Sequence, residues 1–444
     1  MILLKKDHSV LVIGGGVAGI QASLDLADRG FRVYLVEETL SIGGRMAQLD
    51  KTFPTLDCSI CILAPKMIEC FRHPNITLLT YSEVEDVSGS VGNFTVKIVK
   101  KPRFVDEAKC TGCGTCTQKC PVADIPNEFD MLLGNRKAIY MPFPQAVPRI
   151  ATIDKDNCLY FTRAVCKICQ KLCQADAVNF EQEPETITLN VSAIIVATGF
   201  NLLDPSVINE YGYRRYKNVI TSLELERLAN ASGPTGGHVA RPSDEKIPDK
   251  VAFIQCVGSR GLGRGVPYCS SACCMYATKE AILIKEHKPE SEVFIFYIDL
   301  RASGKGFQTF IDRAKENWGI KYIRGRPGEI LEDPRTKDLV IVCEHTVSRE
   351  VKELKVDMVV LCPAFIPKES NKKLSENLGV KLDEHGFFKA KDSMLVPVDT
   401  NVPGVFICGC CQGPKDIPES VAQASGAAAR AVEVVALTAR KEAQ

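Results

Sequence analysis

The sequence predicts an α/β protein in which two nucleotide-binding folds are interrupted by a cysteine-rich insertion. Near the N-terminus, an apolar run leads into the glycine turn "GGGVAG" and then into an amphipathic stretch. Two runs of closely spaced cysteines follow between residues 104 and 184. A second apolar run, "VAFI", opens another strand–helix–strand pattern at residue 251, but cysteines stand where its glycine turn is expected. Alternating strands and helices of this kind favour parallel sheets covered by helices.

Length and composition limit the classes of function. A chain of 444 residues is too long for one ordinary core, and its 45% apolar and 25% charged residues are typical of globular proteins. The formal charge of +1 gives no support to nucleic acid or an anionic membrane as partner. No run approaches the roughly 20 apolar residues of a membrane helix. "MILLKKDH" does not read as a signal peptide, so we expect a cytoplasmic protein.

The twenty cysteines are the most unusual feature of the composition. Most of them stand in tight groups in a long chain without an export signal. Tight grouping in an intracellular chain favours metal or cluster ligation over a disulfide scaffold. The six histidines are scattered without ligand spacing, which disfavours a histidine metal site.

The first nucleotide site is predicted at the N-terminal glycine turn. A strand over residues 10–13 leads into Gly14, Gly16 and Gly19, whose spacing allows a tight turn, close approach of a pyrophosphate and close helix packing. The N-terminus of the following helix offers unpaired N–H groups to phosphate oxygens. The second strand, "RVYLVEE", contains Glu37, which is placed to accept hydrogen bonds from ribose hydroxyls. A purely structural glycine turn is the alternative.

Three later segments resemble those of FAD proteins of the glutathione or thioredoxin reductase type. They are "SIGGRMAQLD", "VSAIIVATGF" and the strand, turn and Ala-rich helix around "FICGCCQGPKDIP". Those reductases carry a Gly-Asp pair at the last turn, but here Cys410 follows Gly409, so the aspartate that would meet the ribitol is absent. The resemblance implies that FAD is bound by Gly14, Gly16, Gly19, Glu37, Gly43, Gly44, Arg45, Met46, Ala197, Thr198, Gly199, Gly409 and Ile417.

The insertion begins with the cysteine spacing of a bacterial ferredoxin. The run is Cys110-x2-Cys113-x2-Cys116-x3-Cys120-Pro121, which binds three corners of one [4Fe–4S] cluster and sends its fourth cysteine to a second cluster. The strength of this pattern disfavours a zinc site or chance.

A second run completes the two-cluster module, with a widened first gap. It reads Cys158-x7-Cys166-x2-Cys169-x3-Cys173, and Gln174 replaces the expected proline. The widened loop makes Cys158 the least certain ligand. By the crossed pattern, one cluster is held by Cys110, Cys113, Cys116 and Cys173, and the other by Cys120, Cys158, Cys166 and Cys169. We expect polar surface connections, "KKPRFVDEAK" and "NFEQEPETITLN", on either side.

The second nucleotide-type domain carries cysteines in place of a nicotinamide site. The turn after its first strand, "CVGSRGLGRG", lacks the GxGxxG spacing in register, and only Asp299 remains as a possible vestige of a ribose-binding acid. A third [4Fe–4S] cluster is predicted here, with redox disulfides or small buried thiols as alternatives. Its ligands would be Cys256, Cys269, Cys273 and Cys274.

These assignments predict five sequence segments. They are a first part of the FAD-binding domain over 1–103, the inserted ferredoxin domain over 104–184 and a second FAD-binding part over 185–245. A degenerate NAD(P)-like domain with its cluster follows over 246–364, and a C-terminal FAD-binding part covers 365–444. Clusters carry single electrons, whereas a flavin exchanges one or two, so FAD flanked by three clusters favours an electron splitter or relay over an NAD-linked reductase.

The whole set of motifs resembles the A subunit of heterodisulfide reductase and its bacterial relatives. The resemblance rests on "GGRMAQLDKTFPTLDCSICILAPKM", "AIYMPFPQAVP", "YCSSACCMYATK" and "CCQGPKDIPESVAQAS" together with the cysteine runs. It implies an anaerobic oxidoreductase subunit that performs flavin-based electron bifurcation or confurcation within a larger complex. The implied partners are ferredoxin, a hydrogenase or formate dehydrogenase module, and subunits like the B and C subunits of heterodisulfide reductase. A homodimer within that complex is compatible with the resemblance.

Other functions remain open at the level of sequence. Relative to the longer archaeal members, the N-terminal cluster domain and the C-terminal ferredoxin domain are expected to be missing. A simple flavin relay, as in quinone-interacting or benzoyl-CoA-reductase complexes, is therefore the nearest alternative. A stand-alone NAD(P)H-dependent disulfide reductase is opposed by the missing second glycine motif. A scaffold with structural zinc is opposed by the neighbouring flavin fold.

Several residues have two interpretations. Cys58 and Cys61 are either additional cluster ligands shared with another subunit or a thiol pair near the flavin, with buried structural thiols as the alternative. Lys415 in "GPKDIP" is a candidate for tuning the flavin by its charge, with a solvated lysine as the alternative, and Lys66 has the same ambiguity. Small-residue packing is favoured over shared ligation for Cys408, Cys410 and Cys411. Core positions are expected for Cys70, Cys343 and Cys362.

Overall fold

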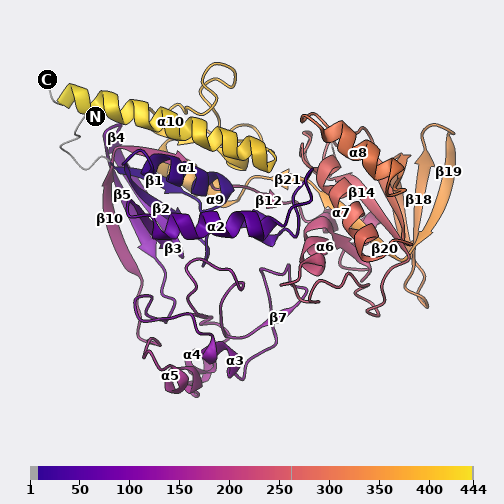
Figure 1. Cartoon of the computed structure of the whole chain (residues 1–444), viewed down its shortest axis with the longest axis horizontal. Helices are drawn as coiled ribbons and strands as arrows, with labels where there is room; N and C mark the ends of the chain where they lie inside the picture. The colour runs from indigo at the N-terminus through magenta and orange to yellow at the C-terminus, as the bar shows by residue number, and fades with distance from the viewer. Residues whose placement is uncertain (1–8, 262, 443–444) are drawn as a thin grey trace. The chain divides into compact units, whose positions relative to one another are not determined.

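The chain forms two compact units in the computed structural model, which describes residues 9–261 and 263–442 (Figure 1). Unit 1 comprises the described residues of Met1–Ala47, Cys61–Phe200 and Pro367–Gln444, and unit 2 comprises Gln48–Ile60 and Asn201–Ile366. The segment "MILLKKDH" therefore lies outside the described residues. Residues 201–245 group with unit 2, although their sequence suggests the flavin domain. The reason is that β13 (Val219–Thr221) pairs in parallel with β20 (Met358–Pro363).

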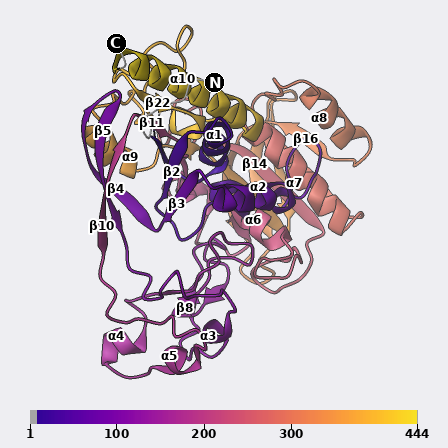
Figure 2. The same ribbon diagram turned by 60° about the vertical axis from the view of Figure 1, so that its left-hand side comes forward.

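Unit 1 is built on a five-stranded parallel sheet with the order β22-β11-β1-β2-β3. Its central strands are almost wholly buried, which explains their continuous apolar sequences. Helices α1 (Val17–Ala27) and α10 (Ile417–Glu442) lie side by side in Figures 1 and 2. The strands are β1 (Ser9–Ile13), β2 (Arg32–Glu37), β3 (Ile76–Thr80), β11 (Ala193–Val196) and β22 (Val405–Ile407).

A three-stranded antiparallel sheet covers one face of this parallel sheet. It has the order β10-β5-β4 and consists of β4 (Ser82–Ser90), β5 (Asn93–Lys100) and β10 (Glu185–Val191). Leu11 and Ile13 of β1 share one buried cluster with Val96 and Ile98 of β5. Since alternate side chains of a strand point to opposite faces, these residues mark the covered face. The remaining helices of the unit are α2 (Ser59–Arg72) and α9 (Ser370–Leu378).

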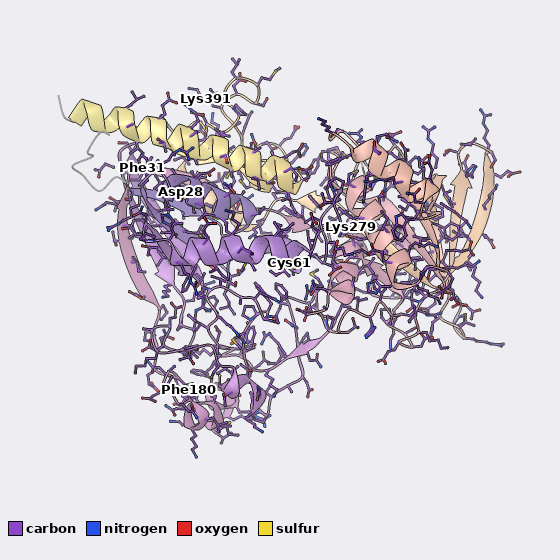
Figure 3. The ribbon with its side chains drawn as sticks, in the orientation of Figure 1. Asp28, Phe31, Cys61, Phe180, Lys279 and Lys391 are labelled. Carbon is purple, nitrogen blue, oxygen red and sulfur yellow. The ribbon has the colours of Figure 1, made fainter. Side chains whose placement is uncertain are left out.

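The cysteine-rich insertion extends from the ends of β5 and β10 (Figure 2). It contains the short helices α3 (Thr115–Gln118), α4 (Leu159–Arg163) and α5 (Ile168–Leu172). Its small core includes Phe104, Ile139, Ile153, Val178 and Phe180, the last of which is labelled in Figure 3. This core is consistent with an inserted module that folds around its own cysteines.

The connections to the insertion differ from the polar surface segments that the sequence predicts. The whole of "ETITLN" belongs to strand β10 and pairs with β5. In the other connection the side chain of Arg103 is only 1% exposed. Its guanidinium donates to Glu107 Oε1 at 2.6 Å, Thr80 Oγ1 at 2.7 Å and the Leu40 carbonyl at 3.0 Å. A buried arginine with satisfied donors therefore fixes the insertion to the sheet of unit 1.

Unit 2 repeats the plan of unit 1. Its parallel sheet has the order β13-β20-β14-β15-β16, and the antiparallel sheet β17-β18-β19 shares a buried cluster with it. Helices α6 (Ser222–Ala229), α7 (Cys273–His287) and α8 (Phe307–Glu316) complete the unit. The remaining strands are β14 (Lys250–Val257), β15 (Glu292–Tyr297), β16 (Lys321–Arg324), β17 (Pro327–Glu332), β18 (Leu339–His345) and β19 (Glu350–Val356).

Helix α7 carries a buried charged cluster that the apolar pattern does not predict. Lys279, labelled in Figure 3, forms an ion pair with Glu226, and both side chains are 1% exposed. Burial lowers the pKa of Lys279 to about 8 and raises the pKa of the neighbouring Glu280 to about 8. Pairing compensates for part of the cost of removing these charges from water. Among the described helices, none combines the length and apolar character needed to cross a membrane.

Candidate functional site

The glycine turn after β1 has the open geometry that a pyrophosphate needs. A side chain at Gly14 or Gly19 would collide with backbone oxygens, at 2.4 Å from Ala197 O and 1.8 Å from Gly14 O respectively. A side chain at Gly16, by contrast, would meet no protein atom within 4 Å. Gly16 is the N-cap of α1. The space that a side chain would occupy at this position is therefore open and lies next to the helix N-terminus. The local fit to a dinucleotide phosphate is good.

Glu37 lies at the end of β2 and faces this turn. Its Oε2 accepts a hydrogen bond from the Gly15 N–H at 2.6 Å, and its Oε1 accepts from the Thr39 N–H at 2.9 Å and hydroxyl at 2.8 Å. The side chain is only 6% exposed, so its position is fixed by these contacts. An ionised carboxylate retains further acceptor capacity for ribose hydroxyls.

The loop after β2 contributes the second glycine pair. Gly43 donates its N–H to Gly15 O at 2.7 Å, and a side chain at Gly44 would come within 3.0 Å of Gly16 Cα. This contact joins the two glycine segments on one edge of the sheet. Burial lowers the pKa of the neighbouring Arg45, while the charge of Glu38 raises it. Met46 is buried at 6% exposure.

The other proposed FAD segments meet the same edge of the parallel sheet. The Ala197 N–H donates to Ile13 O at 2.8 Å, and the Thr198 hydroxyl donates to Asn371 Oδ1 at 3.0 Å. Gly199 adopts a φ of 78°, and a side chain at this position would meet no atom within 4 Å. The structure thus brings the segments around Gly14 and Ala197 together at the carboxyl ends of adjacent strands, where nucleotides bind in open α/β sheets.

The C-terminal segment returns to this sheet through β22. Gly409 follows that strand, and its N–H donates to Gln423 Oε1 of α10 at 2.8 Å. Ile417 is the first residue of α10, and Asp416 and Glu419 cap the helix by accepting from each other's N–H at 2.8 and 3.1 Å. Lys415 precedes this cap, and its carbonyl accepts from the Cys410 thiol at 3.3 Å.

The three cysteines at this turn behave as buried packing groups. Burial raises the pKa of Cys408 well above its usual value and that of Cys411 to about 12, although the positive charge of Lys415 lowers both. The Cys411 thiol donates to Cys408 O at 3.1 Å and to Val196 O at 3.2 Å. Neutral, hydrogen-bonded thiols of this kind favour packing over shared cluster ligation.

One half of the insertion groups the cysteines of the first proposed cluster. Burial raises the pKa of Cys116 to about 11, and nearby Cys110, Cys113 and Cys173 raise it further. The Cys173 sulfur accepts the Ala177 N–H at 3.3 Å. Cys173 comes from the second run, so its presence beside the first run is the arrangement that the crossed pattern requires.

The other half encloses the cysteines of the second proposed cluster. Cys120, Cys158, Cys166 and Cys169 all line one pocket, together with apolar side chains such as Ile139 and Ile153. Burial raises the pKa of Cys169 to about 12, and among the neighbouring cysteines Cys158 makes the largest further contribution to this increase. The widened gap after Cys158 is taken up by helix α4, so it does not move Cys158 away from the pocket.

The structure also shows a repeated signal that cysteine spacing alone does not reveal. Asp106 and Asp154 each stand four residues before the first cysteine of a run. The backbone carbonyl of each accepts the cysteine N–H at 3.0 Å, and each side chain accepts an N–H two residues ahead. The repeat "VDEAKC" and "IDKDNC" could have identified Cys158 as the start of the second run despite its unusual spacing.

In unit 2, β14 and α7 bring three further cysteines into contact. The Cys273 thiol lies near those of Cys256 and Cys274 and lowers the pKa of both. Interaction with Cys273 lowers the pKa of Cys256 to about 7; burial opposes this change and the charge of Arg260 adds to it. The pKa of Cys273 is instead raised well above its usual value. Cys273 and Cys274 open helix α7, whose N-terminal dipole favours negative sulfur.

The position of Cys256 depends on an irregularity at the end of β14. The register between β14 and β20 shifts between Ile254 and Val257, and Cys256 adopts a φ of 58°. A bulge of this kind re-aims a side chain at a strand end. Cys269 lies in the loop before α7, where its sulfur accepts the Ser271 N–H at 3.4 Å, and no described contact joins it to the other three sulfurs.

In the described part of the loop after β14, two backbone N–H groups are not available to a pyrophosphate. The Val266 N–H donates to Gly258 O at 2.8 Å, and the Gly261 N–H donates to Val266 O at 3.2 Å, so these N–H groups are used within the loop. Asp299, the possible vestige of a ribose-binding acid, instead accepts from the Arg260 guanidinium at 2.7 Å. The geometry of unit 2 therefore does not favour a nicotinamide nucleotide at this strand end.

No group of three or more cysteine, histidine or acidic side chains in the described part of the chain surrounds a point suited to a single metal ion. Cys58 and Cys61 are both disulfide-bonded. Cys70, Cys343 and Cys362 are buried, as their isolation suggested.

Substituting Gly16 separates nucleotide binding from folding. We expect Gly16→Ala to fold normally, because its new methyl group meets no protein atom, but to lose most of its FAD through collision with the phosphates. Gly19→Ala is the contrasting variant, since its methyl group collides with Gly14 O and should destabilise the turn itself. Flavin absorbance and thermal unfolding of the purified proteins measure the two effects. Wild-type flavin content in Gly16→Ala would contradict this assignment.

Comparison with protein families agrees with this arrangement of sites. Residues 9–55 match the family described as FAD dependent oxidoreductase, and residues 103–125 match the 4Fe-4S binding domain. Residues 287–428 match the family described as pyridine nucleotide-disulphide oxidoreductase. The chain thus combines oxidoreductase domains of the FAD-dependent type with a 4Fe–4S binding domain.

Solved structures show the same fold at low sequence identity. Thioredoxin reductase from T. acidophilum is 15% identical with a TM-score of 0.53, and the comparison covers 98% of each chain. Thioredoxin reductase from Lactococcus lactis is 16% identical with the same TM-score, over 97% of this chain and 99% of that chain. The predicted thioredoxin-reductase-like fold with an inserted ferredoxin domain is therefore confirmed.

Curated relatives extend the similarity to the whole motif set. The chain is 54% identical over 426 residues to the iron–sulfur A subunit of CoB–CoM heterodisulfide reductase from Methanocaldococcus jannaschii. It is 58% identical over 426 residues to the second such A subunit of Methanopyrus kandleri. Each comparison covers 96% of this chain and 64% of the relative, so the chain spans less than two thirds of their length. Over the region that it spans, the chain belongs to the family of heterodisulfide reductase iron–sulfur A subunits, which are oxidoreductase components.

Proposed function

We propose that the protein is an electron-transfer subunit that binds one FAD and three [4Fe–4S] clusters. The observation that carries this proposal is the grouping of the sulfurs. Cys116 lies beside Cys173 of the other run, and Cys256, Cys273 and Cys274 are in contact where a nicotinamide turn would otherwise stand. Unit 1 supplies an open phosphate-binding turn at Gly16. A bound flavin can accept or donate either one or two electrons, and so connects one-electron and two-electron reactions.

The residues of the chain would bind and orient these groups. Gly14, Gly16 and Gly19 shape the turn, and Glu37 lies ready to accept from the ribose hydroxyls. The apolar walls of the insertion, including Ile139 and Ile153, limit water near the sulfurs. Reduction potentials of clusters depend on such burial and on N–H groups directed at sulfur. The Ala177 N–H at Cys173 and the Arg301 N–H at Cys274 supply two such contacts, at 3.3 and 3.4 Å.

We further propose that this subunit takes part in flavin-based electron bifurcation or confurcation within a complex. Relatives from Methanothermobacter thermautotrophicus and Methanococcus maripaludis are named for H2 or formate, CoB-CoM heterodisulfide and ferredoxin as reactants of their complexes. The proposal transfers this role to the present chain, with ferredoxin and a hydrogenase or formate dehydrogenase module as partners. A cytoplasmic location and a homodimer within the complex belong to the same proposal.

Cofactor analysis of anaerobically purified protein tests the function directly. We expect about twelve iron and about twelve sulfide per chain, together with one FAD. Dithionite should bleach both the flavin and the clusters, whereas NADH and NADPH should not reduce the isolated chain. Zinc without sulfide would contradict the proposal in favour of a scaffold. Rapid flavin bleaching by NADPH would contradict it in favour of a stand-alone disulfide reductase.

A further inference from the structure

Several arginine side chains lie near the end of β14 and the loop that follows it. Arg260 donates to Asp299 at 2.7 Å, and a side chain at Gly261 would come within 3.8 Å of the Arg326 guanidinium. The backbone N–H of Arg301 donates to the Cys274 sulfur at 3.4 Å. Arg324 lies 3.9 Å from Asp299, the acid that also binds Arg260. We call these residues, together with Arg264 of the same loop, the arginine collar.

The collar is exposed and carries an excess of positive charge. Arg264, Arg301, Arg324 and Arg326 are all exposed, and only Arg260 is largely buried. Among the described residues, the acids that form ion pairs with the collar are Asp299, which bridges Arg260 and Arg324, and Glu210, which pairs with Arg264 at 2.8 Å. Five guanidinium groups therefore stand against two carboxylates, in a chain whose formal charge is only +1. The positive surface is a local feature and not a result of general basicity.

A structural explanation accounts for only part of this charge. Arg260 donates to Asp299 at 2.7 Å, and Arg326 lies near Tyr211, whose hydroxyl donates to the Pro327 carbonyl at 3.1 Å. The contact of Arg301 with Cys274 is made by its backbone N–H. Any residue except proline could supply that N–H, so this contact does not require an arginine side chain. Arg324 donates through Nε to the Ile298 carbonyl at 3.4 Å. The exposed guanidinium groups of Arg301 and Arg324 therefore carry positive charge to the surface of unit 2. Surface charge of one sign beside a redox site raises the association rate of partners with the opposite sign.

From this juxtaposition we propose that the arginine collar is the docking surface for a small acidic one-electron carrier protein, which exchanges electrons with the cluster held near Cys256. The proposal rests on the function proposed above. In each encounter one electron passes between the carrier and the cluster, so one centre is oxidised and the other is reduced by the same amount. No bond or proton changes place. Complexes between electron-transfer proteins bury little surface area, so exposed charges can contribute much of their recognition.

Charge reversal with a matched control tests the collar. The test pair is Arg301→Glu with Arg324→Glu. The control pair is Lys246→Glu with Arg335→Glu, which changes the charge by the same amount. The control residues are exposed at the opposite end of β14, where Arg241 binds the Lys246 carbonyl at 2.8 Å and the Thr336 carbonyl at 2.8 Å. Iron and flavin content of each variant reports whether the whole chain still folds and loads its cofactors.

The measurement is calorimetric binding of a strongly acidic plant-type [2Fe–2S] ferredoxin to the whole cofactor-loaded protein. We expect the wild type to bind more weakly as salt rises from about 50 to about 200 mM, because screening shortens the reach of surface charge. The collar variant should bind at least about tenfold more weakly, and the control variant within about twofold of wild type. Equal affinity of collar variant and wild type would overturn the proposal. So would tighter binding of a short DNA duplex than of ferredoxin.

The same samples distinguish failure of this inference from failure of the proposed function. If the third cluster is present but the collar variant binds normally, the docking surface is wrong and the function stands. If the wild type lacks cluster iron, the proposed function is wrong, whatever the binding result.

Discussion

Replacing Cys273 and Cys274 together by alanine is expected to remove one complete cluster from the protein. Iron should fall from about twelve to about eight per chain, because two remaining thiolates cannot hold a cubane. The structure places both residues at the start of α7, with the Cys273 thiol in contact with Cys256. Iron and sulfide analysis of the anaerobic protein measures the loss, and the flavin content should stay unchanged because the glycine turn lies in unit 1.

The matched control removes two thiols that have no proposed ligand role. Cys343 and Cys362 are 5% and 1% exposed and belong to the same unit, and burial raises the pKa of Cys343 to about 11. Their double alanine variant deletes the same number of sulfur atoms and should retain about twelve iron. If the Cys273 and Cys274 variant also kept about twelve, the third cluster and the proposed replacement of a nicotinamide site would both be wrong.

The parallel sheets and cysteine groups could be predicted from the sequence because both have strong local signals. The turn at Gly14, Gly16 and Gly19 and the spacing after Cys110 are encoded by neighbouring residues. Features that depend on contacts between distant segments were harder to predict from the sequence. The antiparallel sheets, and the grouping of residues 201–245 with unit 2, depend on pairings between distant segments. The buried position of Arg103 also could not be anticipated, since arginine is usually exposed.

Site prediction had a similar limit. Spacing alone made Cys158 uncertain, whereas the structure places it in one pocket with Cys120 and Cys169 because helix α4 occupies the extra residues. Spacing also gave no information on charge around the third cysteine group. Arg301 and Arg324 are separated from Cys256 by more than forty residues along the chain, and only the parallel sheet brings their strand ends to the same edge.

The crossed arrangement of the insertion predicts a difference between two double variants. Both remove Cys110, and each removes one further cysteine, either Cys173 or Cys120. In the crossed arrangement Cys110 and Cys173 belong to one cluster, so their loss should remove about four iron and leave the other clusters spectroscopically normal. Loss of Cys110 and Cys120 instead leaves three ligands in each set. That variant should damage both clusters of the insertion and give three-iron signals in oxidised electron paramagnetic resonance spectra.

The comparison of the two double variants is informative because both lack Cys110 and they differ only in whether Cys173 or Cys120 is also removed. An uncrossed arrangement, with all four cysteines of each run on one cluster, exchanges the two outcomes. The structure favours the crossed result because Cys173 adds to the negative surroundings of Cys116, whereas Cys120 shares the pocket of Cys158, Cys166 and Cys169. A clean loss of about four iron on removing Cys110 and Cys120 would therefore overturn the crossed assignment while leaving two clusters in the insertion.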